Sequence, residues 1–241
     1  MVTLVTGSTG KLGRELVKAF TGCLHPKRAE LDIRKQSQVD TYFQDHRPDT
    51  VVHAAALTGI RECEENQKLA WETNVLGTDN LVKAVEQHCP RCRFLYVSTA
   101  CVFKGNRAMY TEEDIPYPEN FYALTKLLGE FLVRRLPNHV IVRINFVARE
   151  KWRYPKAFTD RFGTYLFADE VTLGIRDVVE SNLTGIVHIV GDRKMSVFEL
   201  AKLTTPDVQP MTMNEYKGPP LTIDMSLDTV RWKRYRLRAV V

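Results

Sequence analysis

The sequence predicts an α/β fold in which helices cover both faces of a doubly wound parallel sheet. Three observations predict it: strand and helix patterns alternate through the first two thirds of the chain, the strand-like runs are continuously apolar, and glycines follow the first run. Continuous apolar runs are typical of parallel strands, because such strands are buried on both faces.

Most elements follow from local pattern. In chain order we expect strands at residues 2–6, 51–56, 93–98 and 139–145, which are short and apolar, and helices at 12–20, 36–46, 74–88 and 122–136. The helices place apolar residues at helical spacing, as Leu76, Leu81, Val82 and Val85 do in the third of them. The turn Pro48-Asp49-Thr50 precedes the second strand.

The remainder of the chain is more broken. We expect a helix at 171–180, a strand at 185–190 and a short helix at 196–202 that is capped by Ser196. A loop-rich stretch with four prolines follows, and the basic tail 231–238 is expected to be a solvated surface or a helix end.

Composition excludes several classes of protein. The 241 residues include 34 basic and 29 acidic side chains, and the resulting net charge of +5 is spread along the chain, so we expect no nucleic-acid partner. We see no stretch that would cross a membrane and no secretory signal. An odd number of scattered cysteines, five, favours a reducing cytoplasm.

Cys89-Pro90-Arg91-Cys92 is the one cysteine pair with close spacing. Two cysteines at this spacing could form a redox pair or supply two of the four ligands of a zinc site, but the sequence contains no second CxxC motif to supply the other two. We expect a turn between a helix and a strand there, closed by a disulfide if the source is a thermophile, and no metal site.

A glycine-rich loop, Thr6-Gly7-Ser8-Thr9-Gly10-Lys11-Leu12-Gly13, joins the first strand to the first helix. Such glycines let the backbone approach a pyrophosphate, and the helix N-terminus presents amide donors to it. We therefore expect a Rossmann fold with an NAD(P)-binding domain at residues 1–145. Residues 146–241 are expected to complete the sheet and form a small, shortened C-terminal substrate lobe. The expected cofactor contacts in the loop are Gly7, Thr9, Gly10, Lys11, Leu12 and Gly13.

The segment after the first helix indicates which cofactor binds. An acid about twenty positions past the glycine loop commonly holds the adenosine ribose, whereas a basic residue accommodates the extra phosphate of NADPH. His25-Pro26-Lys27-Arg28 contains no acid, so we expect NADPH, with NADH as the alternative, and Lys27 and Arg28 at the cofactor unless they only face water. Asp32, beside Ile33, is expected either near the adenine or as a helix cap.

Tyr122 and Lys126 form a candidate acid–base pair. At positions i and i+4 of a helix they share one face. A free phenol has a pKa near 10, but a nearby ammonium and a cationic nicotinamide favour its ionised form. Thr99, or Ser98, at the end of a neighbouring strand supplies a hydroxyl for the same substrate oxygen. Together with the glycine loop, these residues indicate nicotinamide-dependent chemistry on a hydroxyl or ketone.

These residues resemble the extended short-chain dehydrogenases, and within them the dTDP-4-dehydrorhamnose reductases. The resemblance runs from residue 1 to about 145, with weaker islands to about 230. It implies an NADPH-dependent reductase of a nucleotide-linked 4-keto-6-deoxysugar, with Thr99, Tyr122 and Lys126 catalytic and Tyr122 as the proton donor. Further cofactor contacts are expected from Ile33, from Tyr122 and Lys126 themselves, and from small or polar residues at strand ends, namely Ala54, Ala55, Ala56, Ser98 and Asn145.

The chain departs from this family in two places. Ala100-Cys101 follows the Ser98-Thr99 pair where relatives usually have an acid and an aromatic residue. The interval before Asp160-Arg161-Phe162-Gly163 is also too short for the helix that usually helps to form the sugar-nucleotide lobe. Basic and aromatic residues occupy it, and we expect them either to grip a diphosphate and stack a base or to form an exposed loop: Arg149, Lys151, Trp152 and Arg153.

Two alternative functions stay open, because fold and motif do not fix function. A sugar-nucleotide epimerase or dehydratase on the same scaffold would retain its cofactor without net turnover. A non-catalytic NADP-binding regulatory subunit is the other, since the regulatory subunit of methionine adenosyltransferase resembles the same family. A homodimer is expected only by analogy with the superfamily.

Overall fold

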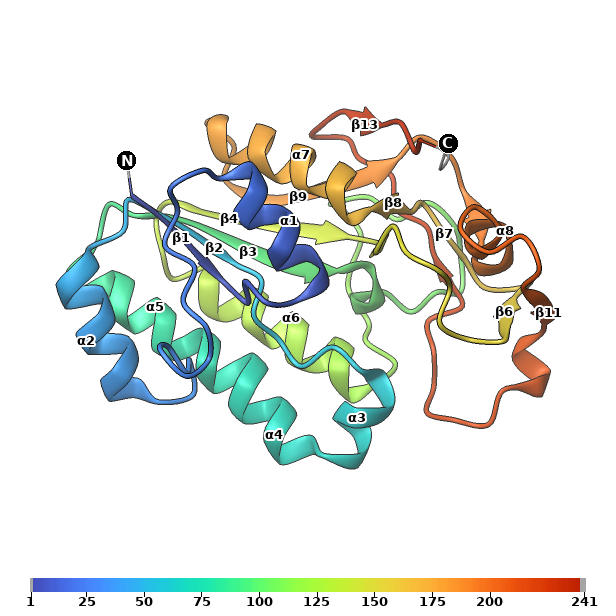
Figure 1. Ribbon diagram of the computed structural model, residues 1–241, viewed down its shortest axis with the longest axis horizontal. Coiled ribbons are helices and arrows are strands. Elements are labelled where there is room, and N and C mark those ends of the chain that lie inside the picture. Colours follow the sequence, from blue (N-terminus) through green and yellow to red (C-terminus); the bar gives the residue numbers. More distant parts are fainter. Residues whose placement is uncertain (1, 239–241) are drawn as a thin grey trace.

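The computed structural model describes residues 2–238. Met1, the first residue of the expected NAD(P)-binding domain, and residues 239–241, the last of the expected C-terminal lobe, lie outside the described part. Six parallel strands form the main sheet in the order β1-β2-β3-β4-β9-β13 (Figure 1). Their bounds are β1 Thr3–Thr6, β2 Thr50–His53, β3 Arg93–Thr99, β4 His139–Ile144, β9 Gly185–Gly191 and β13 Arg234–Tyr235.

Helices cover both faces of this sheet, which confirms the predicted doubly wound architecture. One face carries α1 (Lys11–Ala19) and α7 (Ala168–Glu180), and the other carries α2 (Gln36–His46), α5 (Gly77–His88) and α6 (Phe121–Val133). From β1 the chain first moves outward through α1 to Leu24, which bridges Leu4, and then returns to β2 on the other side of β1. Such a reversal opens a crevice at the carboxyl ends of the strands.

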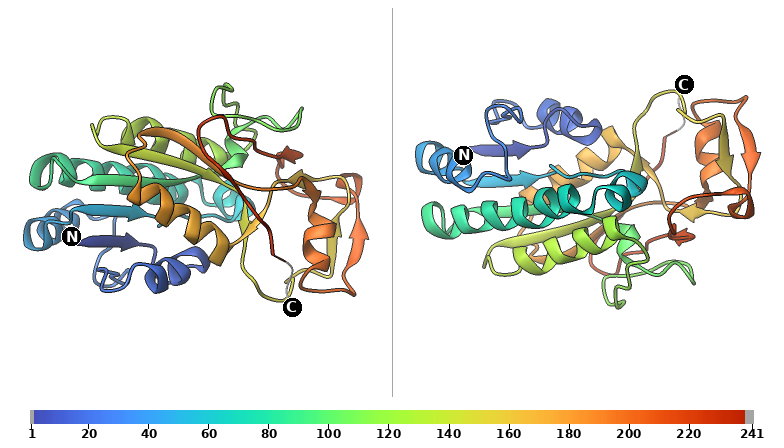
Figure 2. Two further views of the ribbon diagram at one scale, coloured as in Figure 1. Left: turned by 90° about the horizontal axis from the view of Figure 1, so that it is seen from above. Right: turned by 90° about the horizontal axis from the view of Figure 1, so that it is seen from below.

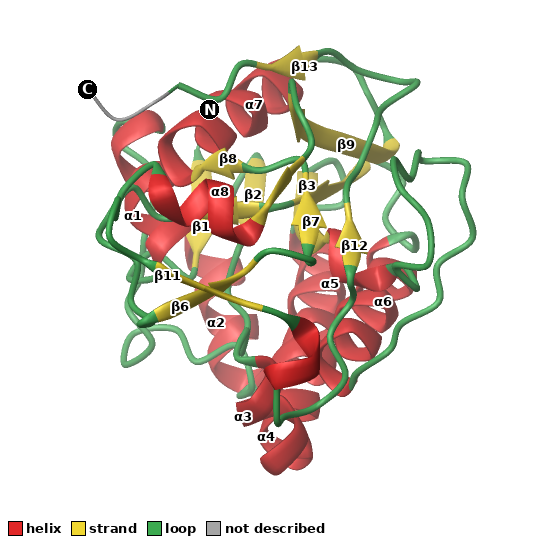
Figure 3. Ribbon diagram, turned by 90° about the vertical axis from the view of Figure 1, so that its right-hand side faces the viewer, coloured by secondary structure: helices red, strands yellow, loops and turns green. Residues whose placement is uncertain are grey.

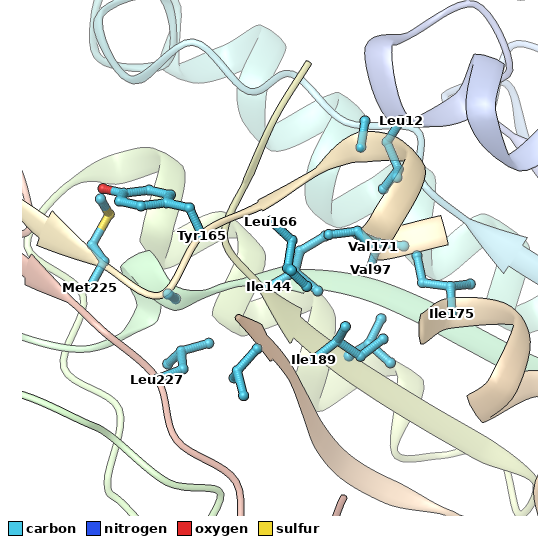
Figure 4. Close-up of a cluster of buried hydrophobic side chains, with 14 of the residues drawn as sticks. Leu12, Val97, Ile144, Tyr165, Leu166, Val171, Ile175, Ile189, Met225 and Leu227 are labelled. Carbon is cyan, nitrogen blue, oxygen red and sulfur yellow. The ribbon is translucent and has the colours of Figure 1, made fainter. Parts of the chain in front are cut away.

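The strands are buried on both faces, as their continuous apolar sequence predicted. Leu4 and Val5, like Val51 and Val52, are neighbours that point to opposite faces, and all four are completely buried. Figure 4 shows part of the core under α1 and α7, where Val97 and Ile144 of the sheet meet aliphatic side chains of the two helices.

The region before α5 contains two helices that the sequence pattern did not predict, α3 (Ile60–Glu65) and α4 (Gln67–Trp71). A π-helical turn, Glu72–Leu76, takes the place of the first residues of the helix expected at 74–88. In this turn the Asn74 side chain accepts a hydrogen bond from the Leu57 amide at 2.7 Å and donates to the Leu57 carbonyl at 2.9 Å. It also donates to the Thr125 hydroxyl at 2.9 Å. A side chain thus fixes the irregular turn against α6.

A second lobe lies beyond the carboxyl ends of the main strands (Figures 2 and 3). It consists of short strands and one short helix, with two-residue strands pairing across large sequence separations. Its elements are β6 Lys156–Phe158 with β11 Gln209–Met211, β7 Phe162–Gly163 between β10 Met195–Ser196 and β12 Asp224–Met225, the helix α8 Val197–Lys202 and a 3-10 turn at Met213–Glu215. A two-stranded connection, β5 Phe146–Val147 with β8 Leu166–Phe167, and a 3-10 turn at Ala100–Val102 lie next to the main sheet.

Ser196 caps α8 as predicted. Its hydroxyl accepts from the Glu199 amide at 3.1 Å, and the Glu199 carboxylate accepts from the Ser196 amide at 2.7 Å. The basic tail differs from the expectation of a helix end, because Arg234–Tyr235 pairs with β9 as the edge strand of the main sheet. Across residues 2–238, every helix is too short or too polar to span a bilayer.

Candidate active site

A cavity of about 790 Å³ opens at the carboxyl ends of β1 to β4 and is lined by residues of both the main sheet and the second lobe. Most residues singled out from the sequence line it: Gly7, Thr9, Gly10, Lys11, Leu12, Gly13, Arg28, Asp32, Ile33, Ala54, Ala55, Ala56, Ser98, Thr99, Tyr122, Lys126, Asn145, Lys151, Trp152 and Arg153. Lys27 and Arg149 are not part of its wall.

The glycine loop forms a cradle with no room for side chains. Gly7 has a φ of 75°, and a Cβ atom there would lie 2.6 Å from the Ala55 nitrogen. A Cβ atom at Gly13 would lie 2.0 Å from the Gly7 carbonyl oxygen. Helix α1 begins without a side-chain cap at Gly10, so its first amide groups are available to an anion. The cradle therefore fits the pyrophosphate of a dinucleotide.

Two arginines surround the acid at the other end of the cradle. Arg34 holds Asp32 with two hydrogen bonds, Nη2 to Oδ2 at 2.6 Å and Nε to Oδ1 at 2.9 Å, and Arg28 approaches at 3.6 Å. The Arg34 hydrogen bond holds the pKa of Asp32 well below its usual range. Asp32 does not cap α2, which begins after Lys35.

The sequence analysis did not identify Arg34 as a cofactor-site residue. Its position two residues after Asp32 could have indicated an ion pair at this end of the cavity. Arg34 lines the cavity, whereas Lys27 is exposed outside it. This end of the cavity therefore holds two guanidinium groups against one ionised carboxylate.

Tyr122 and Thr99 meet at the end of the sheet. Tyr122 lies in the first turn of α6, whose N-cap Asn120 accepts from the Ala123 amide at 2.9 Å, and Thr99 is the last residue of β3. Tyr122 and Thr99 both line the cavity, and the Thr99 hydroxyl accepts a hydrogen bond from the Cys101 amide at 3.1 Å. Burial raises the pKa of Tyr122 above its ordinary value, so its phenol is protonated at neutral pH.

Lys126 lies one helical turn after Tyr122 and is buried. Its Nζ atom is 4.0 Å from the centre of the Tyr96 ring, a cation–π contact. Burial lowers the pKa of Lys126 to about 7, although the negative charge of Glu130 acts in the opposite direction. The Lys126 side chain therefore exchanges between its ammonium and its neutral amine form near neutral pH.

A polar row crosses the sheet beneath these residues. Ser98, Arg143 and His188 are register partners on β3, β4 and β9. Glu130 of α6 accepts hydrogen bonds from the first two of them. Sequence reasoning missed Glu130 and Arg143, although an arginine inside an apolar strand was a signal for a buried partner.

The short interval before Asp160, expected to lack the helix usual in the family, contributes Lys151, Trp152 and Arg153 to the cavity wall. Trp152 is fixed by two hydrogen bonds, from its amide to the Thr205 hydroxyl at 2.8 Å and from its indole to the Lys156 carbonyl at 3.2 Å. Arg149 turns away from the cavity, because its guanidinium is paired with Asp169 and Glu170, each at 3.1 Å.

The second lobe adds residues to the cavity wall that sequence reasoning did not identify. They are Arg161, Tyr165, Val197, Leu200 and Met225. Val197 and Leu200 lie on the predicted helix α8, whereas the other three lie in or beside two-residue strands that become recognisable only through pairing with distant segments.

The five cysteines are free thiols. Cys89 and Cys92 form the predicted turn, in which the Cys92 amide donates to the Cys89 carbonyl at 2.8 Å. Burial raises the pKa of both thiols, which disfavours the reactive thiolate. Within residues 2–238, no three His, Cys, Asp or Glu side chains are arranged to hold a metal ion.

The chain is similar in sequence to several known proteins. A family model described as the RmlD substrate binding domain matches residues 1–162. Methionine adenosyltransferase 2 subunit beta of Bos taurus is 27% identical over 95% of this chain and 80% of its own length. The dTDP-4-keto-6-deoxy-D-glucose reductase of Streptomyces niveus is 29% identical over 83% of this chain and 76% of its own.

A solved structure shares the fold. The dTDP-4-dehydrorhamnose reductase of Bacillus anthracis, in complex with NADP, superposes with a TM-score of 0.87 at 24% identity, covering 94% of this chain and 90% of that one.

Proposed function

The chain belongs to the RmlD substrate-binding domain family, and we propose that it is an NADPH-dependent reductase of a nucleotide-linked 4-keto-6-deoxysugar. One observation carries this proposal: the hydroxyls of Tyr122 and Thr99 and the buried Lys126 line the same cavity as the glycine cradle. An acid–base pair beside a dinucleotide cradle is what carbonyl reduction requires.

The residues present fit NADPH. The backbone of the glycine loop would hold the pyrophosphate, and the arginines around Asp32 would hold the additional phosphate of the adenosine. When bound, the cofactor supplies a hydride to the carbonyl carbon. The Bacillus anthracis reductase with this fold was crystallised with NADP, which supports the choice.

Tyr122 completes the reduction. Its protonated hydroxyl would donate a proton to the carbonyl oxygen as the carbon accepts the hydride, so that the ketone becomes an alcohol. The Thr99 hydroxyl, which lines the same cavity, would hydrogen-bond the same carbonyl oxygen. Lys126 in its ammonium form would stabilise the negative charge that remains on the phenolate.

The test is consumption of NADPH in the presence of dTDP-4-dehydrorhamnose generated in place. Tyr122→Phe removes the proton donor and should reduce kcat by about a hundredfold or more. The control is Tyr117→Phe, because Tyr117 is exposed and lies outside the cavity wall. An inactive native protein that still binds NADPH would instead favour a different sugar nucleotide or a regulatory role.

A further inference from the structure

The hydroxyl of Tyr165 is buried at the cavity wall without a hydrogen-bond partner. Among residues 2–238, four buried side-chain nitrogen or oxygen atoms lack a partner, and the other three belong to Arg93, Arg143 and His188. None of those three residues lines the cavity, whereas Tyr165 does. Because buried hydroxyls are nearly always satisfied, this one points to a partner that enters the cavity.

The Tyr165 ring is held in place. It lies against Gly163, where a Cβ atom would be 2.6 Å from the Tyr165 Cζ atom. The preceding residue, Thr164, is fixed to Leu227 by two hydrogen bonds of 3.0 Å. Figure 4 shows the ring directed away from Ile144 and Leu166, with its hydroxyl on the side of Met225. The hydroxyl is therefore preorganised.

Tyr165 lies near the reacting end of the cavity. Cys101 is close enough to interact electrostatically with both Tyr122 and Tyr165. The Cys101 sulfur also lies 3.4 Å from that of Met225. All four side chains line the cavity, so a ligand whose carbonyl reaches Tyr122 brings adjacent atoms toward Tyr165.

The surroundings favour a neutral ligand group. Met225, Val197 and Leu200 of the same lobe contribute apolar side chains to the cavity wall. The guanidinium of Arg161 is engaged by the Thr222 carbonyl at 2.9 Å and the Met225 sulfur at 3.1 Å. Burial raises the pKa of the Tyr165 phenol above its ordinary value, although the positive charge of Arg161 acts in the opposite direction, so the hydroxyl keeps its proton and can donate a hydrogen bond. A sugar ring, with apolar faces and hydroxyl edges, matches this combination better than a diphosphate does.

We propose that Tyr165 is a specificity-determining residue that donates a hydrogen bond to a hydroxyl of the substrate's sugar ring, an assignment that rests on the proposed reductase function. The test is Tyr165→Phe, which deletes only the hydroxyl. The KM for dTDP-4-dehydrorhamnose should rise about three- to tenfold. The KM for NADPH should not change. Inhibition by dTDP should not change either, because dTDP lacks the 6-deoxyhexose ring that Tyr165 is proposed to contact.

Tyr110→Phe is the matched control. Tyr110 is equally buried, but its hydroxyl accepts from the Gly105 amide and donates to Asn106, both at 3.0 Å. Its variant should melt at a lower temperature with an unchanged KM. Tyr165→Phe should melt no lower than the native protein, because it removes an unpaired buried group.

An unchanged KM in Tyr165→Phe would overturn the assignment, and an equal loss of dTDP inhibition would overturn the sugar as its target. If the native protein binds NADPH but does not consume it with the sugar nucleotide, the proposed reductase function is wrong, and the role of Tyr165 is tested by binding alone. The same variant is then titrated calorimetrically with dTDP-rhamnose and with dTDP: selective weakening of dTDP-rhamnose supports the role of Tyr165, and equal binding refutes it.

Discussion

Glu130 and Arg143 form a completely buried ion pair behind the candidate active site, with Arg143 Nη2 2.7 Å from Glu130 Oε2. Glu130 also accepts a hydrogen bond from Ser98 at 2.5 Å. Ser98 precedes Thr99 on β3, and Glu130 follows Lys126 by one turn of α6. Glu130 therefore joins α6, the helix that carries Tyr122, to β4 through Arg143 and to β3, the strand that carries Thr99, through Ser98.

Breaking this pair should be costly. Glu130→Gln or Arg143→Met alone leaves a buried charge or its donors without a partner, and we expect the free energy of unfolding to fall by about 3–5 kcal/mol. Urea unfolding measures it. The double variant Glu130→Leu with Arg143→Met should be more stable than either single variant, because neither charge remains. Single variants that lose less than about 1 kcal/mol would contradict a buried pair.

Activity should decline as pH rises through about 7, where Lys126 loses its proton. The ammonium is the form that stabilises the phenolate, so activity is present below this pKa and lost above it. In Glu130→Gln the decline should occur at lower pH, because the charge that raises the Lys126 pKa is gone. The measurement is kcat/KM against pH for both proteins, below their melting temperatures. Superimposable profiles would show that Glu130 does not act on Lys126.

His53 should make the protein sensitive to acid. The ring is buried between the hydroxyls of Thr6 at 2.7 Å and Thr78 at 3.0 Å, and burial lowers its pKa to about 3. The folded pKa lies below the unfolded value of about 6.5, so the stability contribution is complete above pH 6.5 and is lost as pH falls toward 3.

Between pH 7 and pH 5 this single group should account for about 2 kcal/mol of lost stability. The measurement is urea unfolding at both pH values for the native protein and for His53→Gln. The variant should lose less on acidification, whatever its stability at pH 7. Equal losses would show that His53 does not titrate on unfolding.

The parts predicted from sequence are those encoded over short distances. The glycine loop and the Tyr122–Lys126 pair depend on spacing within one turn or one helix, and both face the cavity. Tyr165 had no such signal, because it lies in the short connection between two-residue strands, β7 and β8, and β7 is defined by pairing with β12 about sixty positions later. Which of Lys27 and Arg34 faces the cavity depends on loop geometry, which spacing does not encode.

The arginines around Asp32 should set the preference for NADPH. Arg34→Ala removes a cation and releases Asp32, which can then accept from ribose hydroxyls, so the KM for NADPH should rise about tenfold relative to that for NADH. Arg28→Ala should act in the same direction but more weakly, because Arg28 is 68% exposed. Steady-state kinetics with both cofactors measures the ratio. Lys27→Ala is the control, since Lys27 lies outside the cavity wall; if it shifts the ratio as much as Arg34→Ala does, general surface charge and not this arginine pair selects the cofactor.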